Sequence, residues 1–168
     1  MGSGKSAVGR RLASQLGLSF YDSDDEIESR TGVDIPYIFE KEGESGFRKR
    51  EAAVIAELVM LDDVVLATGG GAAEDPDTRR LLAANGTVVY LYTGVEEQIR
   101  RTSKSLNRPL LNKGDPAEVL ERLMQLRDPQ FCNIADFIVT TDGRQVAAVT
   151  KELQRKLAAG SATDIAGS

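Results

Sequence analysis

The sequence contains no histidine among its 168 residues. Without an imidazole, the chain cannot build a Ser-His-Asp triad, a Cys-His pair or an ordinary histidine zinc site. Any catalysis must therefore use carboxylates, lysine, arginine and a metal ion bound through oxygen. The single cysteine, Cys132, excludes an internal disulfide and fits a reducing, cytoplasmic environment. A lone cysteine of this kind is more often a small core residue than a nucleophile.

Long apolar runs and an excess of positive charge are also absent. No apolar stretch approaches the ~20 residues of a membrane span, and the first residues lack the pattern of a secretory signal peptide. The net charge of −5 argues against nucleic acid as a partner. With 41% hydrophobic and 28% charged residues, the composition is typical of a soluble globular protein. We expect one domain, a monomer, with neither membrane nor nucleic-acid partners.

A phosphate-binding loop, Gly2-Ser3-Gly4-Lys5-Ser6, stands at the start of the sequence. Its glycines let backbone N–H groups point at phosphate oxygens, while Lys5 supplies charge and the Ser6 hydroxyl can bind Mg²⁺. Val8, Leu12 and Leu16 then recur at helical spacing, so the phosphates would meet the N-terminus of an amphipathic helix. A chance glycine-rich terminus is the alternative, and it loses weight against the motifs further along the chain.

The full loop pattern, G-x-x-x-x-G-K-[ST], would place its first glycine two positions before Met1. The strand that normally leads into such a loop is also absent from the sequence. We expect both in about ten residues ahead of Met1, judging by typical strand and loop lengths. A damaged copy of the gene is the alternative.

Acidic residues follow the first predicted strand, residues 18–21. The segment Asp22-Ser23-Asp24-Asp25 places carboxylates opposite the phosphate loop, where Mg²⁺ and a hydroxyl nucleophile require them. Asp24 or Asp25 could instead cap a helix over residues 26–30. We expect different aspartates to share the two tasks.

The rest of the chain alternates apolar strands with amphipathic helices, which predicts an α/β fold with a parallel sheet flanked by helices. Further strands are expected over residues 64–68, 87–92 and 137–140. Further helices are expected over residues 35–42, 43–60, 76–84, 95–102, 116–127 and 146–157. Residues 159–168 lack periodicity and are expected to form a disordered tail.

Polar residues stand at conspicuous places on these elements. Arg48 lies in the first turn of its helix, where the macrodipole disfavours a cation, so we expect it to meet an anion. Gly69-Gly70-Gly71 directly follows a buried strand, at the edge where α/β proteins bind ligands. Residues 101–111 could form a lid that brings Arg108 to the phosphates. Arg127 ends its predicted helix and could simply complement the helix dipole.

This ordered set of motifs resembles the shikimate kinase family, from Met1 to about Leu157. A phosphate loop alone is weakly specific, whereas the whole set in order is strongly specific. The motifs are Gly2-Ser3-Gly4-Lys5-Ser6, Tyr21-Asp22-Ser23-Asp24, Gly46-Phe47-Arg48, Thr68-Gly69-Gly70-Gly71, Asn107-Arg108-Pro109-Leu110-Leu111 and Leu126-Arg127.

The resemblance implies a three-layer P-loop kinase fold in a single domain, residues 1–158. It implies a shikimate-binding region at about 22–60 and a lid at about 102–114. The implied reaction is the ATP-dependent phosphorylation of the 3-hydroxyl of shikimate, with Mg²⁺, in aromatic amino-acid biosynthesis. Phosphoryl transfer needs mainly positioning and charge neutralisation, which agrees with a site that lacks histidine.

The resemblance also implies a role for each matching residue. Ser6 would bind Mg²⁺, with Asp22 in the outer shell of the metal. Asp24 would bind the shikimate hydroxyls and act as the candidate base. The substrate carboxylate would meet Arg48 and Arg127 beside the backbone of Gly70 and Gly71. ATP would meet Gly2, Ser3, Gly4, Lys5, Ser6, Ala7 and Arg108, with Arg101 and Arg144 near the adenine.

Two alternatives remain open from the sequence. Arg48 and Arg127 favour a carboxylate substrate without naming it, so a gluconate-kinase-like enzyme is possible. A non-catalytic nucleotide-binding paralogue would follow if the loop is truly truncated. Ala7 also departs from the family, which usually has threonine there, and the lost hydroxyl would weaken nucleotide binding by about 1 kcal/mol.

Overall fold

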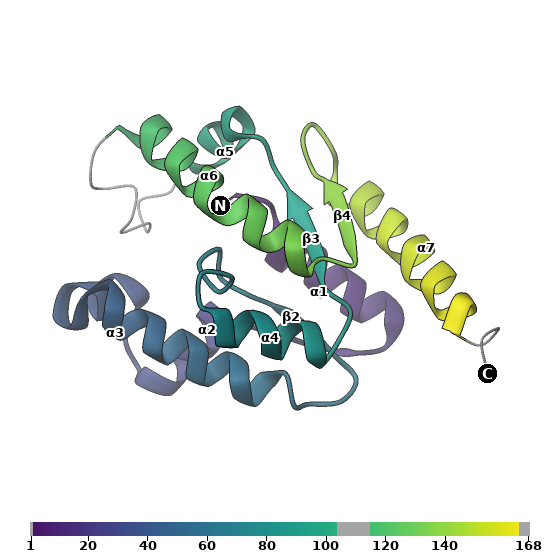
Figure 1. Ribbon diagram of the computed structural model, residues 1–168, viewed down its shortest axis with the longest axis horizontal. Helices are drawn as coiled ribbons and strands as arrows, with labels where there is room; N and C mark the ends of the chain where they lie inside the picture. Colours follow the sequence, from purple (N-terminus) through teal and green to yellow (C-terminus); the bar gives the residue numbers. More distant parts are fainter. Residues whose placement is uncertain (1, 104–114, 165–168) are drawn as a thin grey trace.

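Strands and helices alternate along most of the chain (Figure 1), and the computed structural model describes residues 2–103 and 115–164. The strands are β1 (Ser19–Asp22), β2 (Val64–Ala67), β3 (Val89–Tyr92) and β4 (Phe137–Thr140). The helices are α1 (Lys5–Leu16), α2 (Ser23–Thr31), α3 (Ile35–Leu58), α4 (Pro76–Ala84), α5 (Val95–Thr102), α6 (Pro116–Ile134) and α7 (Val146–Asp164).

The strands form two parallel pairs in the described ranges. Strand β1 pairs with β2, with Ser19 opposite Val64, and β3 pairs with β4, with Val89 opposite Phe137. Helix α1 contacts β1 and β2, and it also packs against α7, which contacts β4. The alternating sequence pattern predicted parallel strands flanked by helices, which is confirmed, although the described residues form two separate strand pairs rather than one continuous sheet.

Two apolar cores hold the strands and helices together. The first lies where α1 and α7 meet the β3/β4 pair, and the second lies between α2 and α3. Along β3, Val89 and Leu91 pack against the first core, whereas Tyr90 faces α6 through Asp128. The buried residues of the first core are Val8, Leu12, Val139, Val149 and Leu153, and those of the second are Ile27, Ile38, Phe47, Val54 and Leu58.

A cavity of about 810 Å³ extends from the phosphate loop into the space between β2 and β3. Residues 65–67 of β2 and residues 89–91 of β3 line it together, so the two strands face the same space. Most residues of these strands are only half-buried, although both strands are strongly apolar. An apolar parallel strand is normally buried on both faces, so β2 and β3 are less covered than their sequences predict.

The helix that carries Arg48 is divided at Gly43. Residues 35–42 and 43–60 were expected as two helices, and α3 (Ile35–Leu58) consists of two helical segments joined by a kink at Gly43, so the predicted division is confirmed. Gly43 has φ 70°, a left-handed conformation that only glycine adopts readily. The kink redirects the second half of α3, which carries Phe47 into the core and Arg48 to the cavity.

Asp22, rather than Asp24 or Asp25, caps the second helix. Its carboxylate accepts a hydrogen bond from the Asp24 backbone N–H at 3.0 Å, and α2 begins directly after it at Ser23. The sequence placed this helix start several residues too late. Capping by Asp22 leaves the Asp24 side chain available to the cavity, which it lines.

The predicted end of helix α6 at Arg127 is wrong, because the helix continues through Pro129 to Ile134. Tyr90 of β3 explains the continuation: its ring stacks on Phe131 at 5.0 Å and its hydroxyl donates to Asp128 at 2.9 Å. Tertiary contacts thus hold the helix together beyond the proline, which costs one backbone hydrogen bond. Arg127 therefore lies inside the helix and does not complement its C-terminus.

Further corrections concern the tail and the cysteine. Helix α7 runs to Asp164, so residues 159–164 are helical rather than disordered. Residues 165–168 lie outside the described residues. Cys132 is exposed and is not a core residue. None of the helices in residues 2–103 and 115–164 is long and apolar enough to cross a membrane.

Candidate active site

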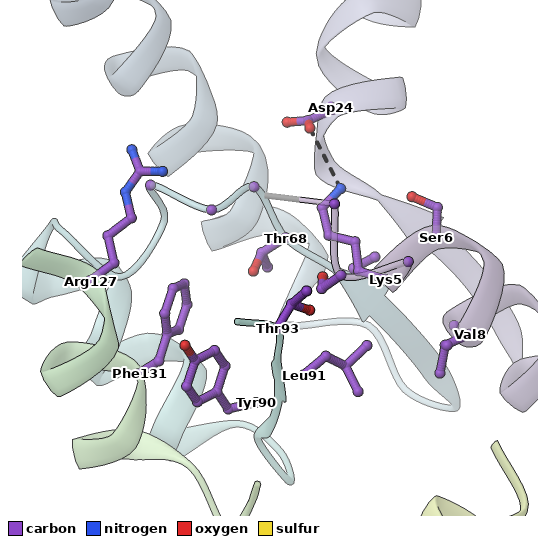
Figure 2. Close-up of a pocket in the computed structure, with 18 of the residues that line it drawn as sticks. Lys5, Ser6, Val8, Asp24, Thr68, Tyr90, Leu91, Thr93, Arg127 and Phe131 are labelled. Atoms are coloured by element: carbon purple, nitrogen blue, oxygen red, sulfur yellow. Dashed lines mark ion pairs between the residues drawn. The ribbon is translucent and has the colours of Figure 1, made fainter. Parts of the chain in front are cut away.

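The phosphate loop meets the carboxyl end of β1 through three polar side chains. Ser6 Oγ donates a hydrogen bond to Asp22 Oδ2 at 2.6 Å, and Lys5 Nζ lies 3.3 Å from the same oxygen. Lys5 also pairs with Asp24 Oδ2 at 3.6 Å, as the dashed line in Figure 2 shows. Because α1 begins at Lys5 after Gly4, its free backbone N–H groups add to this cationic end of the cavity.

Asp22 and Asp24 differ in their surroundings. The Asp22 side chain is buried and held by Ser6, Lys5 and the α2 backbone, whereas Asp24 is about one third exposed and lines the cavity. Burial raises the pKa of the Asp24 carboxyl above its usual value; the Lys5 ammonium opposes this rise and the Asp22 carboxylate adds to it. A carboxylate with a raised pKa in a cavity has the properties of a general base.

Oxygen atoms of the same residues are suited to Mg²⁺. The described parts of the chain hold no group of three or more His, Cys, Asp or Glu side chains that could form a metal cage. The adjacent Ser6 hydroxyl and Asp22 carboxylate nevertheless offer two hard oxygen donors. Mg²⁺ takes few protein oxygens and completes its shell with water and substrate phosphates, so this donor pair fits it.

Arg48 enters the cavity from α3 with two carboxylate partners. Its Nη1 lies 2.6 Å from Glu51 Oε2, and its Nη2 lies 3.2 Å from Glu44 Oε1. Burial would lower the pKa of Arg48, but the charge of Glu51 and its hydrogen bond outweigh burial, so the pKa rises. The anion that Arg48 was predicted to meet is therefore present within the protein itself. The two glutamates contact Nη1 and Nη2 of Arg48 and leave its Nε without a hydrogen-bond partner.

Glu51 was not identified as a site residue from the sequence. Its side chain is 2% exposed, and burial raises the pKa of its carboxyl while the Arg48 charge opposes the rise. The spacing Arg48-x-x-Glu51 places both side chains on one face of a helix, and this was the available signal. The buried Glu51 carboxylate fixes where the half-buried Arg48 guanidinium lies.

Arg127 projects from α6 and lines the cavity on the side away from Lys5 and Ser6 (Figure 2). Its side chain is 7% exposed, and its Nε lies 2.7 Å from Glu74 Oε1. Glu74 belongs to the turn after Gly71 and was also missed from the sequence. Nothing in the local pattern points to it, because its partner lies 53 residues away.

The three consecutive glycines fit closely against these charged side chains. A Cβ on Gly69 would collide with Glu51, and one on Gly71 would collide with the Arg48 guanidinium. A Cβ on Gly70 would lie 3.2 Å from Arg127 Nη1. The glycines therefore make room for two arginines and a glutamate at the end of β2, and the ligand contact expected there stays a prediction.

Unpartnered polar atoms gather at this place. Among the described residues, four buried side-chain nitrogen or oxygen atoms have no hydrogen-bond partner, and three of them are Arg48 Nε, Glu51 Oε1 and Arg127 Nη2. Orphaned buried polar groups are costly and rare in proteins. Two cationic donors without partners, on side chains that line a common cavity, have the chemistry to bind an anion such as a carboxylate.

Of the remaining residues predicted to bind the nucleotide, some line the cavity and others do not. Gly2, Ser3, Gly4 and Ala7 line the cavity with Lys5 and Ser6. Arg101 also lines it, but its guanidinium already bonds Gly2 O and the Thr141 hydroxyl, each at 3.0 Å.

Arg144 is not among the lining residues. It donates to Thr140 O at 3.0 Å and pairs with Glu152 at 2.8 Å. Arg108 and most of the predicted lid, residues 104–114, lie outside the described residues.

Comparison with known proteins agrees with this geometry. The family model described as shikimate kinase matches residues 1–158. A shikimate kinase of Pseudomonas syringae pv. tomato is 54% identical over 158 residues, covering 94% of this chain and 92% of the relative. One from Nitrosococcus oceani is 55% identical, covering 94% of this chain and 83% of the relative.

Solved structures of the same kind superpose on the chain. The structure of Acinetobacter baumannii shikimate kinase in complex with shikimate has a TM-score of 0.93 at 45% identity, covering 95% of this chain and 89% of that one. The Aquifex aeolicus shikimate kinase structure has a TM-score of 0.84 at 34% identity, covering 96% and 94%.

Proposed function

The chain belongs to the shikimate kinase family, and from this premise we propose how its residues divide the work of the reaction. Its activity is that of a shikimate kinase: ATP phosphorylates the 3-hydroxyl of shikimate on the route to aromatic amino acids. The observation that best supports these roles is that Arg48 and Arg127 each have a buried nitrogen without a hydrogen-bond partner.

The shikimate carboxylate binds between Arg48 and Arg127, against the backbone of Gly70 and Gly71. Both guanidinium groups are buried at least in part and retain a nitrogen without a partner. A carboxylate is the group that a pair of guanidinium forks recognises best. This orientation places the hydroxyls of the ring toward Asp24, which lines the same cavity.

Asp24 accepts the proton of the attacking hydroxyl. As that proton moves to the Asp24 carboxylate, the substrate oxygen forms a bond to the γ-phosphorus and the bond to the β–γ bridging oxygen breaks. ADP leaves with the electron pair of the broken bond. Lys5 lies 3.6 Å from Asp24 and stands beside the loop that holds the phosphates, so it neutralises charge on the transferred group. Arg108 completes the phosphate contacts from the lid.

We assign Mg²⁺ to the Ser6 hydroxyl, with Asp22 in its outer shell. When bound, the metal neutralises the charge that builds up on the β- and γ-phosphates during transfer. The support is the donor pair itself, since Ser6 Oγ and Asp22 Oδ2 are 2.6 Å apart. Asp22 also caps α2, so it fixes the position of Asp24 two residues later.

The nucleotide occupies the phosphate loop and the end of β4. Backbone groups of Gly2, Ser3, Gly4 and Ala7 surround the phosphates, and the adenine lies near Arg101. The Arg101 bonds to Gly2 and Thr141 suggest that it also ties the loop to β4. Arg144 remains a proposed adenine contact. Residues 1–158 act as one domain, with a shikimate-binding region at about 22–60 and a lid at about 102–114.

We further propose that the space between β2 and β3 accommodates another parallel strand. Both strands turn apolar, half-buried residues toward one cavity, and Gly2 and Ser3 line the same cavity. A strand in this space would lead directly into the phosphate loop. It would join the two strand pairs into one sheet, the central layer of a three-layer fold. It would cover apolar surface that is costly to leave beside water.

A coupled ADP-release assay with ATP, Mg²⁺ and shikimate tests these assignments. It compares this chain with a form that carries an apolar strand of about five residues ahead of Gly2, and gluconate serves as the control substrate. We expect turnover with shikimate, none with gluconate, and faster turnover in the extended form. Equal rates in both forms would refute the strand proposal. Nucleotide binding without turnover in either form would indicate a non-catalytic nucleotide-binding protein.

The monomeric state and the cytoplasmic location stay predictions. Sedimentation of the purified chain and fractionation of the cells that make it would check them.

A further inference from the structure

The turn after the glycines carries a carboxylate, Glu74, that none of the assignments above uses. Its Oε1 accepts a hydrogen bond from Arg127 Nε at 2.7 Å. The Glu74 side chain is 29% exposed, whereas the Arg127 side chain is 7% exposed. The buried Arg127 guanidinium is thus held by a partly exposed carboxylate at the edge of the site.

The hydrogen bond uses one edge of the guanidinium and leaves the other free. Glu74 contacts Nε, while Nη2 is buried without a partner and Nη1 lies beside the Gly70 backbone. A guanidinium held through Nε still presents both Nη groups, which is the arrangement for a two-bond contact with a carboxylate. If Glu74 engaged Nη2 instead, the edge that faces Gly70 would already be occupied.

Glu74 is itself held in place by the fold. Its backbone N–H donates to Gly71 O at 2.9 Å, and its carbonyl accepts from Arg79 Nη1 at 3.2 Å. The turn that carries Glu74 thus connects the glycines to α4. A fixed carboxylate on a short turn restricts the rotation of a long, otherwise mobile side chain.

We propose that Glu74 is a positioning residue for shikimate, which sets the orientation of Arg127 through Nε. This inference rests on the proposed binding of the shikimate carboxylate by Arg127. Glu74 touches neither the substrate nor the phosphates in this proposal, so its effect is confined to the affinity for the carboxylate. The charge of Glu74 is balanced by Arg127 and also supports the charged form of Arg48.

Kinetics of two Glu74 variants test the proposal. We expect Glu74→Ala to raise the KM for shikimate about tenfold, the effect of losing one charge-assisted hydrogen bond. The KM for ATP and kcat should change less than about twofold, because neither depends on the carboxylate contact. Glu74→Gln retains an acceptor for Nε and should recover most of the affinity. Asp77→Asn is the matched control, since Asp77 is exposed and forms an ion pair with the exposed Arg80.

A second substrate distinguishes positioning from a general structural effect. The carboxamide of shikimate lacks the charged group that Arg127 binds, so its KM should be the same for Glu74→Ala and the wild type. A parallel rise for both substrates, a parallel rise in the KM for ATP, or an unchanged or lower KM for shikimate would overturn the proposal. Wild-type turnover with shikimate tests the proposed function separately, because it does not depend on Glu74.

Discussion

The two glycine-rich segments of the cavity use glycine for different physical reasons. In the phosphate loop, Gly4 has φ 78°, and a Cβ there would meet nothing within 4 Å. At the end of β2, Gly69 and Gly71 have no such conformation, but a Cβ on either would collide with a charged side chain. The first segment needs glycine for its backbone conformation and the second needs it for space.

This difference divides the site into two halves. In the proposed function, the phosphate loop binds through backbone N–H groups and a helix N-terminus, which suits any nucleotide phosphate. The proposed carboxylate site of Arg48 and Arg127 beside Gly71 uses side chains that tertiary packing positions, which suits one substrate. Asp24 and Lys5 lie where the halves meet. Substitutions should therefore separate the affinity for ATP, the affinity for shikimate and the chemical step.

The largest effect is expected at the junction, from Asp24→Asn. Losing the base should lower kcat by roughly 10² to 10⁴, while ATP binding changes little. Steady-state kinetics and nucleotide titration measure the two effects. Asp25→Asn is the control, because Asp25 is exposed and pairs with Arg10 at 2.7 Å on the surface. Unimpaired turnover in Asp24→Asn would remove Asp24 as the base.

Protonation of Asp24 should lower the activity of the protein and raise the stability of its folded state. Because the pKa of Asp24 is raised in the folded protein, wild-type activity should fall as pH drops through a value above 3.8. The folded state binds this proton more tightly, so the contribution to stability is present at low pH and is lost as pH rises through the folded pKa. Asp24→Asn should lose this stability change. A midpoint for activity at or below 3.8 would contradict the assignment.

Gly71→Ala should produce the next largest effect, on the shikimate half alone. The new Cβ would displace the Arg48 guanidinium, and the loss of this contact should raise the KM for shikimate roughly 100-fold. The KM for ATP should remain within about twofold of the wild type. Gly86→Ala is the control, because a Cβ at Gly86 meets nothing within 4 Å. An equal rise in both KM values would show that the halves are not independent.

Gly4→Ala should affect the nucleotide half by a smaller factor. Alanine at φ 78° is strained by about 1 to 2 kcal/mol, which corresponds to roughly a tenfold rise in the KM for ATP. The KM for shikimate should be the same in Gly4→Ala as in the wild type. Gly17→Ala introduces a comparable strain at φ 72° beyond the end of α1, so it should lower the unfolding midpoint without changing the KM for ATP. If both variants alter that KM equally, the effect is one of stability.

Ala7→Thr is expected to have the smallest effect. Restoring a hydroxyl near the phosphates should lower the KM for ATP about fivefold, the equivalent of one hydrogen bond or ~1 kcal/mol. Ala7→Val adds similar bulk without the hydroxyl and should give no such gain. Parallel KM measurements for ATP and shikimate check the prediction. A gain with valine as well would point to packing rather than a hydrogen bond.

Much of the fold could be predicted because its signals are local. The apolar runs of the strands and the spacing of Val8, Leu12 and Leu16 identified element types correctly. Boundaries failed where contacts other than apolar periodicity decided them, in one case with a distant strand and in the other with a neighbouring capping side chain. Helix α6 passes Pro129 because Tyr90 packs against its last turns, and α2 begins at Ser23 because Asp22 caps it. Periodicity does not carry information about such contacts.

The sequence by itself determined the chemistry: the absence of histidine, the phosphate loop, and the order of Asp24, Arg48, the glycines and Arg127. Only the tertiary structure decided which atoms are available. It shows that Asp22 rather than Asp24 caps α2, and that Glu74 holds Arg127 through Nε. The physical reason is that residue types fix charge and hydrogen-bonding capacity, whereas partners far apart in the chain fix burial and orientation. Glu74 and Arg127 are 53 residues apart and meet only in the folded protein.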